Sequence, residues 1–272
     1  MSPVVEKSLL IAAVAGFGAT LLLRLVMNRR GNESWWPLAG GLSVVLLFLL
    51  MAVTARWLRE SQGPFLTLYD ILLSNLFSLT LVFLIAASLV PALRTATTIV
   101  LAFLGLLGIW SLNVAPDAVP LPATFDNPWL WLHVLSGKLF LGLCMLAAGT
   151  ALLLLTRATR TDKAVRIPDT GADMDDAVWL TLSLAFVCHS FMLIAGAIWA
   201  HSAWGRYWAW DSLETWTFIT WLAIALLLHA RVTFRRMPAS VGWSAVVVIF
   251  GLAVLTFFGV PFISIAPHKG VM

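Results

Sequence analysis

The sequence predicts an all-α protein, a polytopic membrane helix bundle of about eight transmembrane helices. Hydrophobic residues make up 61% of the 272 positions and charged residues only 11%, which is too little polar surface to solvate a globule of this size. Apolar runs recur along the whole chain, and most approach the roughly 20 residues that a helix needs to cross the hydrocarbon core. These runs are 8–29, 36–55, 71–92, 97–113, 129–156, 177–200, 214–230 and 241–263.

Basic residues in the connections predict the orientation, because Lys and Arg accumulate on the cytoplasmic side of a membrane. Alternating the connections between the two sides places eleven basic residues on one side and six on the other. The larger set is Arg24, Arg29, Arg30, Arg94, Arg157, Arg160, Lys163, Arg166, Arg231, Arg235 and Arg236. We therefore expect both termini on the outer face, together with the connections near 56–70, 114–128 and 200–213. The net charge of +4 reflects this topology, and no nucleic-acid partner is expected.

We expect a single transmembrane domain over residues 1–272, because the sequence contains no internal repeat and no soluble domain. The longest cytoplasmic connection, about 157–176, is interpreted as a solvated charged loop, with a partner surface as the alternative. Cys144 and Cys188 fall inside predicted helices, and the chain has no CxxC or CxxCH motif. This argues against thiol redox chemistry and against haem attached covalently to this chain.

Tryptophan is concentrated in the predicted outer connection at about 199–216. Five tryptophans lie within this stretch, more than a membrane-interface anchor needs. Large flat side chains at a membrane surface can stack on a flat hydrophobic ligand, and Arg206 is available to bind its carboxylates. Asp211 and Glu214 precede the next apolar run with the spacing of a helix N-terminal capping pattern. Capping is the favoured interpretation for both, although direct ligand contact stays open.

The five histidines are candidate iron ligands, because neutral imidazole binds iron and polar groups in a membrane are costly without a purpose. His133 opens the fifth helix and His268 follows the eighth, so both are expected on the outer face. This pair brackets the tryptophan-rich loop, which contains His201. His229 is expected toward the inner end of the seventh helix and His189 near the middle of the sixth.

Residues 196–231, GAIWAHSAWGRYWAWDSLETWTFITWLAIALLLHAR, resemble the tryptophan-rich WWD signature and following helix of cytochrome c assembly proteins of the CcsA/ResC type. The segment Gly63-Pro64-Phe65-Leu66-Thr67-Leu68-Tyr69-Asp70 is similar to that family's Gly-x-x-Pro-Leu-x-x-Leu-Tyr-Glu segment. Leu132-His133-Val134 resembles the family's first external histidine, and Pro267-His268 stands where its second belongs.

The resemblance implies a haem-handling subunit of a cytochrome c synthase in a bacterial cytoplasmic membrane or a thylakoid-type membrane. His133 and His268 would be the axial ligands of haem iron, and His229 would be the intramembrane histidine. The residues expected to hold the macrocycle are Trp204, Trp208, Trp210, Asp211 and Arg206. The haem would be haem b, bound transiently and without a covalent bond. No catalytic residue is assigned.

The same resemblance implies two partners: a membrane protein of the CcsB/ResB type, and an apocytochrome c with a CxxCH motif. The subunit would present haem on the outer side while thioether bonds form to this acceptor.

Two other functions stay open. An electron-transfer subunit would hold b-type haem permanently between helices, and a haem transporter would move it outward without an acceptor. The first needs a histidine pair within the bilayer, for which His189 and His229 are the candidates. Their estimated depths differ by only ~6 Å at 1.5 Å rise per residue, so we also consider an inner haem site formed by these two residues. The favoured alternative is that His189 is a core residue hydrogen-bonded to a neighbouring helix.

Overall fold

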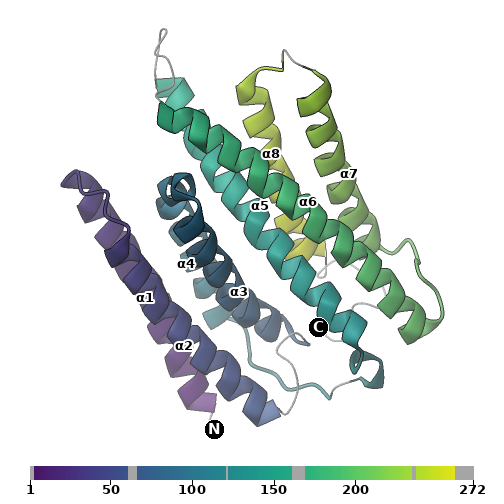
Figure 1. Ribbon diagram of the computed structural model, residues 1–272. Helices are drawn as coiled ribbons and strands as arrows, with labels where there is room; N and C mark the ends of the chain where they lie inside the picture. The colour runs from purple at the N-terminus through teal and green to yellow at the C-terminus, as the bar shows by residue number, and fades with distance from the viewer. Residues whose placement is uncertain (1–2, 61–65, 121, 161–168, 235–236, 261–272) are drawn as a thin grey trace. The chain divides into compact units, whose positions relative to one another are not determined.

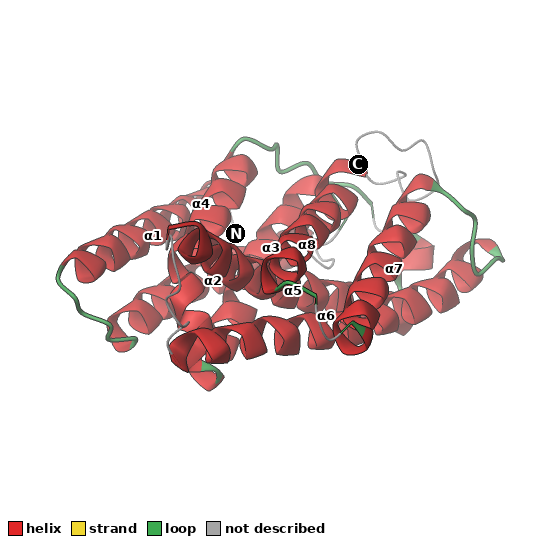
Figure 2. Cartoon of the chain, turned by 90° about the horizontal axis from the view of Figure 1, so that it is seen from above, coloured by secondary structure: helices red, strands yellow, loops and turns green. Residues whose placement is uncertain are grey.

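The computed structural model describes residues 3–60, 66–120, 122–160, 169–234 and 237–260. Every regular element within these ranges is helical (Figure 2). Eight of the helices are long and apolar enough to cross a membrane. The predicted fold class and the predicted number of spans are therefore confirmed.

The described helices form two compact units, four helices in each. Unit 1 contains α1 (Pro3–Arg29), α2 (Trp36–Glu60), α3 (Leu68–Leu89) and α4 (Thr97–Leu112). A 3₁₀ turn, Pro91–Ala96, joins α3 to α4. Helix α1 packs against α2 and α4, and α3 packs against the same two helices (Figure 1).

Unit 2 contains α5 (Pro128–Arg160), α6 (Asp169–Trp204), α7 (Ser212–Thr233) and α8 (Ala239–Val254). A π-helical turn, Leu255–Gly259, continues α8. Helices α5 and α6 lie antiparallel, and three side-chain contacts fix their register at intervals of three or four residues, one helical turn each. The pairs in contact are His133–Gly196, Gly137–Met192 and Phe140–His189.

The described residues of the predicted cytoplasmic loop at 157–176 are helical, because α5 continues to Arg160 and α6 begins at Asp169. Acidic residues at the start of a helix are stabilised by the partial positive charge of its N-terminus. Asp175 is also not a solvated loop residue. Its Oδ1 accepts hydrogen bonds from the indole N–H groups of Trp179 at 3.0 Å and Trp243 at 2.7 Å, and its Oδ2 accepts one from Arg231 at 2.9 Å. Asp175 thus joins α6, α7 and α8 at one end of unit 2.

The tryptophan-rich segment is only partly a loop. Helix α6 continues to Trp204 and α7 begins at Ser212, so 205–211 form the turn between them. Trp199, His201 and Trp204 therefore project from the last turns of α6 instead of from a connection.

Candidate functional site

His133 lies in the second turn of α5, where its Nδ1 is 2.8 Å from the backbone oxygen of Met192 on α6. A carbonyl oxygen can only accept a hydrogen bond, so Nδ1 must carry the proton. The basic lone pair of the neutral ring is consequently on Nε2. This arrangement is typical of a metal-binding histidine, whose second nitrogen donates to a carbonyl or carboxylate and fixes the tautomer.

Gly196 allows this close approach of α5 and α6. A Cβ at position 196 would lie 2.6 Å from His133 Nδ1 and 2.9 Å from its Cε1. One turn further along α6, the indole of Trp199 stacks on the His133 ring, with 6.3 Å between centroids and 25° between planes. The imidazole is therefore fixed in orientation by a hydrogen bond and by an aromatic neighbour.

The turn at 205–211 has an unusual backbone conformation. Gly205 has φ +76° and Trp210 has φ +57°, in the left-handed region. Glycine adopts this region without cost, whereas a bulky residue rarely does, so the position of Trp210 must be imposed by the surrounding structure. Trp210 is 69% exposed, which presents its indole outward from the turn.

Aromatic rings continue from this turn along α7. The ring of Phe218 is 6.1 Å from that of Trp208 and 6.4 Å from that of Trp210, and it stacks on Trp221 at 6.0 Å with an interplanar angle of 8°. The planes of Trp208 and Trp210 are inclined at 81°, so the two rings do not form one flat surface. The Nε1 of Trp208 is buried and has no hydrogen-bond partner in the described part of the chain. An indole N–H can only donate, so this atom is suited to an acceptor such as a carboxylate.

Asp211 caps α7, as the sequence predicted. Its Oδ1 accepts a hydrogen bond from the backbone N–H of Glu214, the third residue of the helix, at 2.8 Å. Glu214 also reaches back, but to the backbone N–H of Ala209 at 2.6 Å and not to the capping residue itself. Together these carboxylates fix the backbone of the turn that carries Trp208 and Trp210.

The remaining predicted outer-face residues lie around the same turn. Arg206 is exposed, and His201 is exposed and stacks on Tyr207 with 4.2 Å between ring centroids. His268 falls outside the described residues, so its predicted pairing with His133 stays a prediction.

His189 and His229 have different surroundings in the structure. His189 has no solvent exposure, and its ring stacks on Phe140 of α5 at 4.0 Å. His229 is exposed near the end of α7, with its Nε2 3.4 Å from the hydroxyl of Thr233 on the same helix. The hypothesis that the two imidazoles face each other across an internal cavity stays a prediction.

Sequence reasoning missed two features near this site. Thr124 accepts a hydrogen bond from Trp199 Nε1 at 2.9 Å, and Phe125 packs edge-on against the same indole at 5.4 Å. Both residues belong to the connection near 114–128 that the sequence predicts on the outer face. Nothing in its composition indicates which backbone oxygen meets an indole.

A comparison with protein families settles the class of the protein. The family described as Cytochrome C assembly protein matches residues 35–268. This chain belongs to the cytochrome c assembly protein family. The resemblance noted in the sequence is confirmed, and the cytochrome c assembly protein described here is an integral membrane protein with a part in cytochrome c maturation.

Individual relatives of this cytochrome c assembly protein match over most of both chains. The cytochrome c biogenesis protein CcsA of Parasynechococcus marenigrum (strain WH8102) is 26% identical, with 93% of this chain and 94% of the relative covered. The protein of the same name from Synechococcus elongatus (strain ATCC 33912 / PCC 7942 / FACHB-805) is 28% identical over 84% of this chain and 85% of its own. That of Trachelium caeruleum is 26% identical, with 84% of each covered.

A solved structure, cytochrome c heme lyase CcmF, has the same fold. It superposes with a TM-score of 0.70 and covers 95% of this cytochrome c assembly protein at 18% identity. The chain spans 47% of that protein. At this identity the likeness shows the helical architecture alone.

Proposed function

We propose that this cytochrome c assembly protein is a haem-handling subunit of a cytochrome c synthase. In this proposal it holds haem b non-covalently at the outer membrane face and presents it to an apocytochrome c with a CxxCH motif. The observation that carries the proposal is the tautomer of His133. Its Nδ1 proton is held by the Met192 carbonyl, and the lone pair that would bind iron is on Nε2.

The surrounding donors fit a haem. Trp208 offers a buried indole N–H to a propionate, and the exposed guanidinium of Arg206 offers a charged partner to the same kind of group. Trp204, Trp208 and Trp210 supply aromatic contact area around the turn at 205–211. Asp211 serves mainly to fix that turn through its cap on α7.

The reaction itself requires orientation more than acid or base chemistry from this chain. Each acceptor thiol adds across a haem vinyl group: the sulfur bonds to one vinyl carbon, the thiol proton goes to the other, and nothing is oxidised or reduced overall. The vinyl groups and the iron belong to the haem. Ligation by His133 and contact with the tryptophans would hold the vinyl edge still relative to the acceptor, which lowers the entropic part of the barrier.

The other histidines have separate parts in the proposal. His268 would be the second axial ligand, opposite His133. His229 would belong to an inner site completed by a membrane partner of the CcsB/ResB type, and its exposed position on α7 leaves it accessible to a second protein. His189 has the weakest claim, because Phe140 covers its ring.

Replacement of His133 tests the proposal. In the protein purified from membranes, His133→Gly should lose most of the bound haem or its low-spin spectrum, and added imidazole should restore both by filling the vacant axial position. His201→Gly is the matched control, because this histidine also lies near the tryptophan-rich turn but stacks on Tyr207. Unchanged haem content and spectrum in His133→Gly would overturn the assignment.

A further inference from the structure

Unit 1 contains a cavity at the end where α1 and α3 begin and α4 ends. Its volume is about 190 Å³, and its lining comes from these three helices and from the connection after α4. Most of the lining is apolar, with Val4 and Leu10 of α1, Leu112 of α4 and Val114 of the connection among the contributors. None of these residues takes part in the proposed haem site, so the cavity needs a separate explanation.

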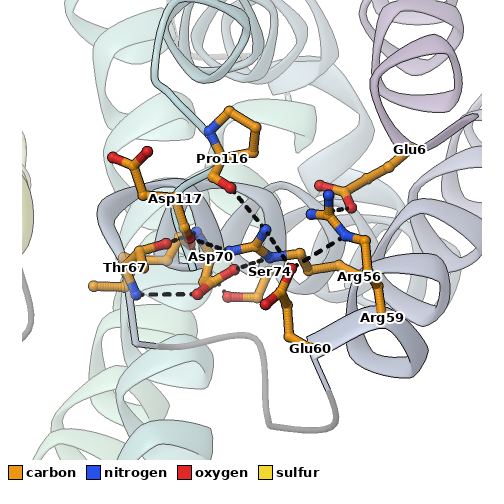
Figure 3. Close-up of polar contacts among 10 residues, drawn as sticks. Glu6, Arg56, Arg59, Glu60, Thr67, Asp70, Ser74, Pro116 and Asp117 are labelled. Atoms are coloured by element: carbon orange, nitrogen blue, oxygen red, sulfur yellow. Dashed lines mark hydrogen bonds and ion pairs between the residues drawn. The ribbon is translucent and has the colours of Figure 1, made fainter. Parts of the chain in front are cut away.

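A buried ionic cluster adjoins the cavity through Glu6. We call it the Arg56 cluster; its members are Glu6, Arg56, Arg59, Glu60 and Asp70 (Figure 3). The Glu6 side chain is 2% exposed, and its Oε2 is 2.9 Å from Nη2 of Arg59. A charge this deeply buried is costly unless it is paired, and Arg59 supplies the pairing. Glu6 therefore offers carboxylate oxygens to the cavity without an unbalanced charge.

Arg56 holds two further lining residues, Tyr69 and Pro116, in place. Its Nη1 donates to the carbonyl of Pro116 at 3.0 Å, and its guanidinium lies over the Tyr69 ring with 5.5 Å from Cζ to the ring centroid. Arg56 is itself fixed by a hydrogen bond from its Nε to Asp70 Oδ1 at 2.8 Å (Figure 3). This side of the cavity is consequently preformed, which lowers the ordering cost of binding a ligand.

Ser111 contributes a polar atom that the fold leaves unused. It lies in the last turn of α4, lines the cavity and has no solvent exposure. A helical serine can donate its hydroxyl to the carbonyl four residues earlier, as Ser88 of α3 does to Leu84 at 2.7 Å. The Oγ of Ser111 has no hydrogen-bond partner in the described part of the chain. A buried hydroxyl without a partner is unfavourable, so Ser111 favours a ligand that can hydrogen-bond to it.

The volume of the cavity limits the ligand to about one ring. An apolar cavity of ~150 Å³ binds benzene, which has six heavy atoms. In proportion, a cavity of about 190 Å³ accommodates a six-membered ring with one or two further heavy atoms.

The polar lining selects the substituent on that ring. A carboxylate would be repelled by Glu6, and an ammonium would lie beside Arg59, which already neutralises Glu6. Lys7 also lines the cavity, but it is exposed, so water weakens its attraction for an anion. A neutral hydroxyl, in contrast, can donate to Glu6 and accept from Ser111.

We propose that this cavity binds a neutral hydroxylated ring compound, of the phenol or cyclohexanol class, that partitions into the membrane interface. The apolar lining contacts the ring, and Glu6 and Ser111 bind the hydroxyl. The inference does not rest on the proposed function, because every residue that carries it belongs to unit 1 and its test needs no haem.

Binding of para-fluorophenol is the direct test, with fluorobenzene, which lacks the hydroxyl, as the matched compound. The full-length protein in lipid nanodiscs is titrated with each compound and followed by fluorine NMR, and empty nanodiscs correct for partitioning into lipid. We expect saturable binding of para-fluorophenol with a dissociation constant of about 1 mM or below. Fluorobenzene should bind roughly 2–10-fold more weakly, the effect of one net hydrogen bond. No saturable binding of para-fluorophenol, or equal affinity for the two compounds, would overturn the proposal.

Replacement of Ser111 tests the hydroxyl contact. Ser111→Ala should weaken para-fluorophenol binding by roughly 2–10-fold and leave fluorobenzene binding as in the wild type. Ser88→Ala is the matched control, because the Ser88 hydroxyl bonds within its own helix. Wild-type affinity for para-fluorophenol in Ser111→Ala would refute the selection of a hydroxylated ligand.

Filling the cavity tests where the compounds bind. Val114→Phe places a ring in the cavity and should abolish binding of both compounds. Val44→Phe adds the same ring at a 53% exposed position of α2 and should leave binding unchanged. Equal binding by the two variants would locate the compounds outside the cavity and disprove the proposal. If Val114→Phe does not fold, the comparison of Ser111→Ala with Ser88→Ala decides by itself.

Discussion

The close contact between Gly196 and His133 gives a sharp test of the ligand geometry. In Gly196→Ala the new Cβ would lie 2.6 Å from His133 Nδ1, whereas ordinary van der Waals contact begins at 3.4 Å. The ring must move away by about 0.8 Å, the difference between these distances. A shift of this size directed along the 2.8 Å hydrogen bond to Met192 lengthens it to ~3.6 Å, at which it is no longer a hydrogen bond.

Loss of a hydrogen bond that orients a metal-binding histidine usually lowers metal affinity 10–100-fold, so we expect haem affinity in Gly196→Ala to fall by roughly that factor. The assay is titration of the haem-free protein with haem, followed by its absorption spectrum. Gly251→Ala is the control, because Gly251 is also helical and a Cβ there meets nothing within 4 Å. Both changes should gain about 1 kcal/mol of helix propensity. Equal haem affinity in the two variants would refute the geometry inferred for His133.

Three further outcomes follow from the site. Trp208→Ala should lower haem affinity. Asp211→Asn should keep most of the haem and lower the free energy of unfolding by ~0.5–2 kcal/mol, the usual effect of a weakened cap. If haem titrations and melting curves give the reverse ranking, Asp211 is a direct contact. Trp210→Gly should raise the melting temperature, because it removes a bulky residue from a left-handed conformation that costs roughly 1–2 kcal/mol. The same variant should bind less haem. A lower melting temperature would contradict the strain argument. His189→Leu should leave haem content unchanged. It should also stabilise the protein by about 1–3 kcal/mol, because neither ring nitrogen of His189 has a hydrogen-bond partner among the described residues. Loss of haem in this variant would assign His189 a ligand role.

The helices could be predicted from the sequence because the physical signal is simple. An apolar run long enough to cross a bilayer must be helical, since a lipid environment offers no partner for free backbone groups. The helix ends were harder. Asp175 was placed in a loop because its charge suggests water, yet it lies within α6 and binds Arg231 and two indoles. Sequence shows the charge of such a residue, and only the packing of α7 and α8 shows its partners.

The site was predictable to a similar extent. The cap at Asp211 depends on local spacing and could be read directly. The tautomer of His133 could not, because it depends on a carbonyl 59 positions away in the sequence. In the sequence, Arg56 is one basic residue at the start of the predicted outer connection near 56–70. Its contacts with Asp70 and with backbone 60 positions later are long-range, so no local pattern indicates them.

The three hydrogen bonds to Asp175 join α6, α7 and α8 at one end of unit 2. Because that end is held, a small tilt of any of these helices would displace it less than the opposite end. Helix α7 has 22 residues and is about 33 Å long at 1.5 Å rise per residue. A tilt of about 5° about Asp175 would therefore move the opposite end, where Trp208 and Trp210 lie, by ~3 Å in this helix geometry. With Asp175 as the pivot, the displacement from such a tilt would be largest at the tryptophan-rich turn.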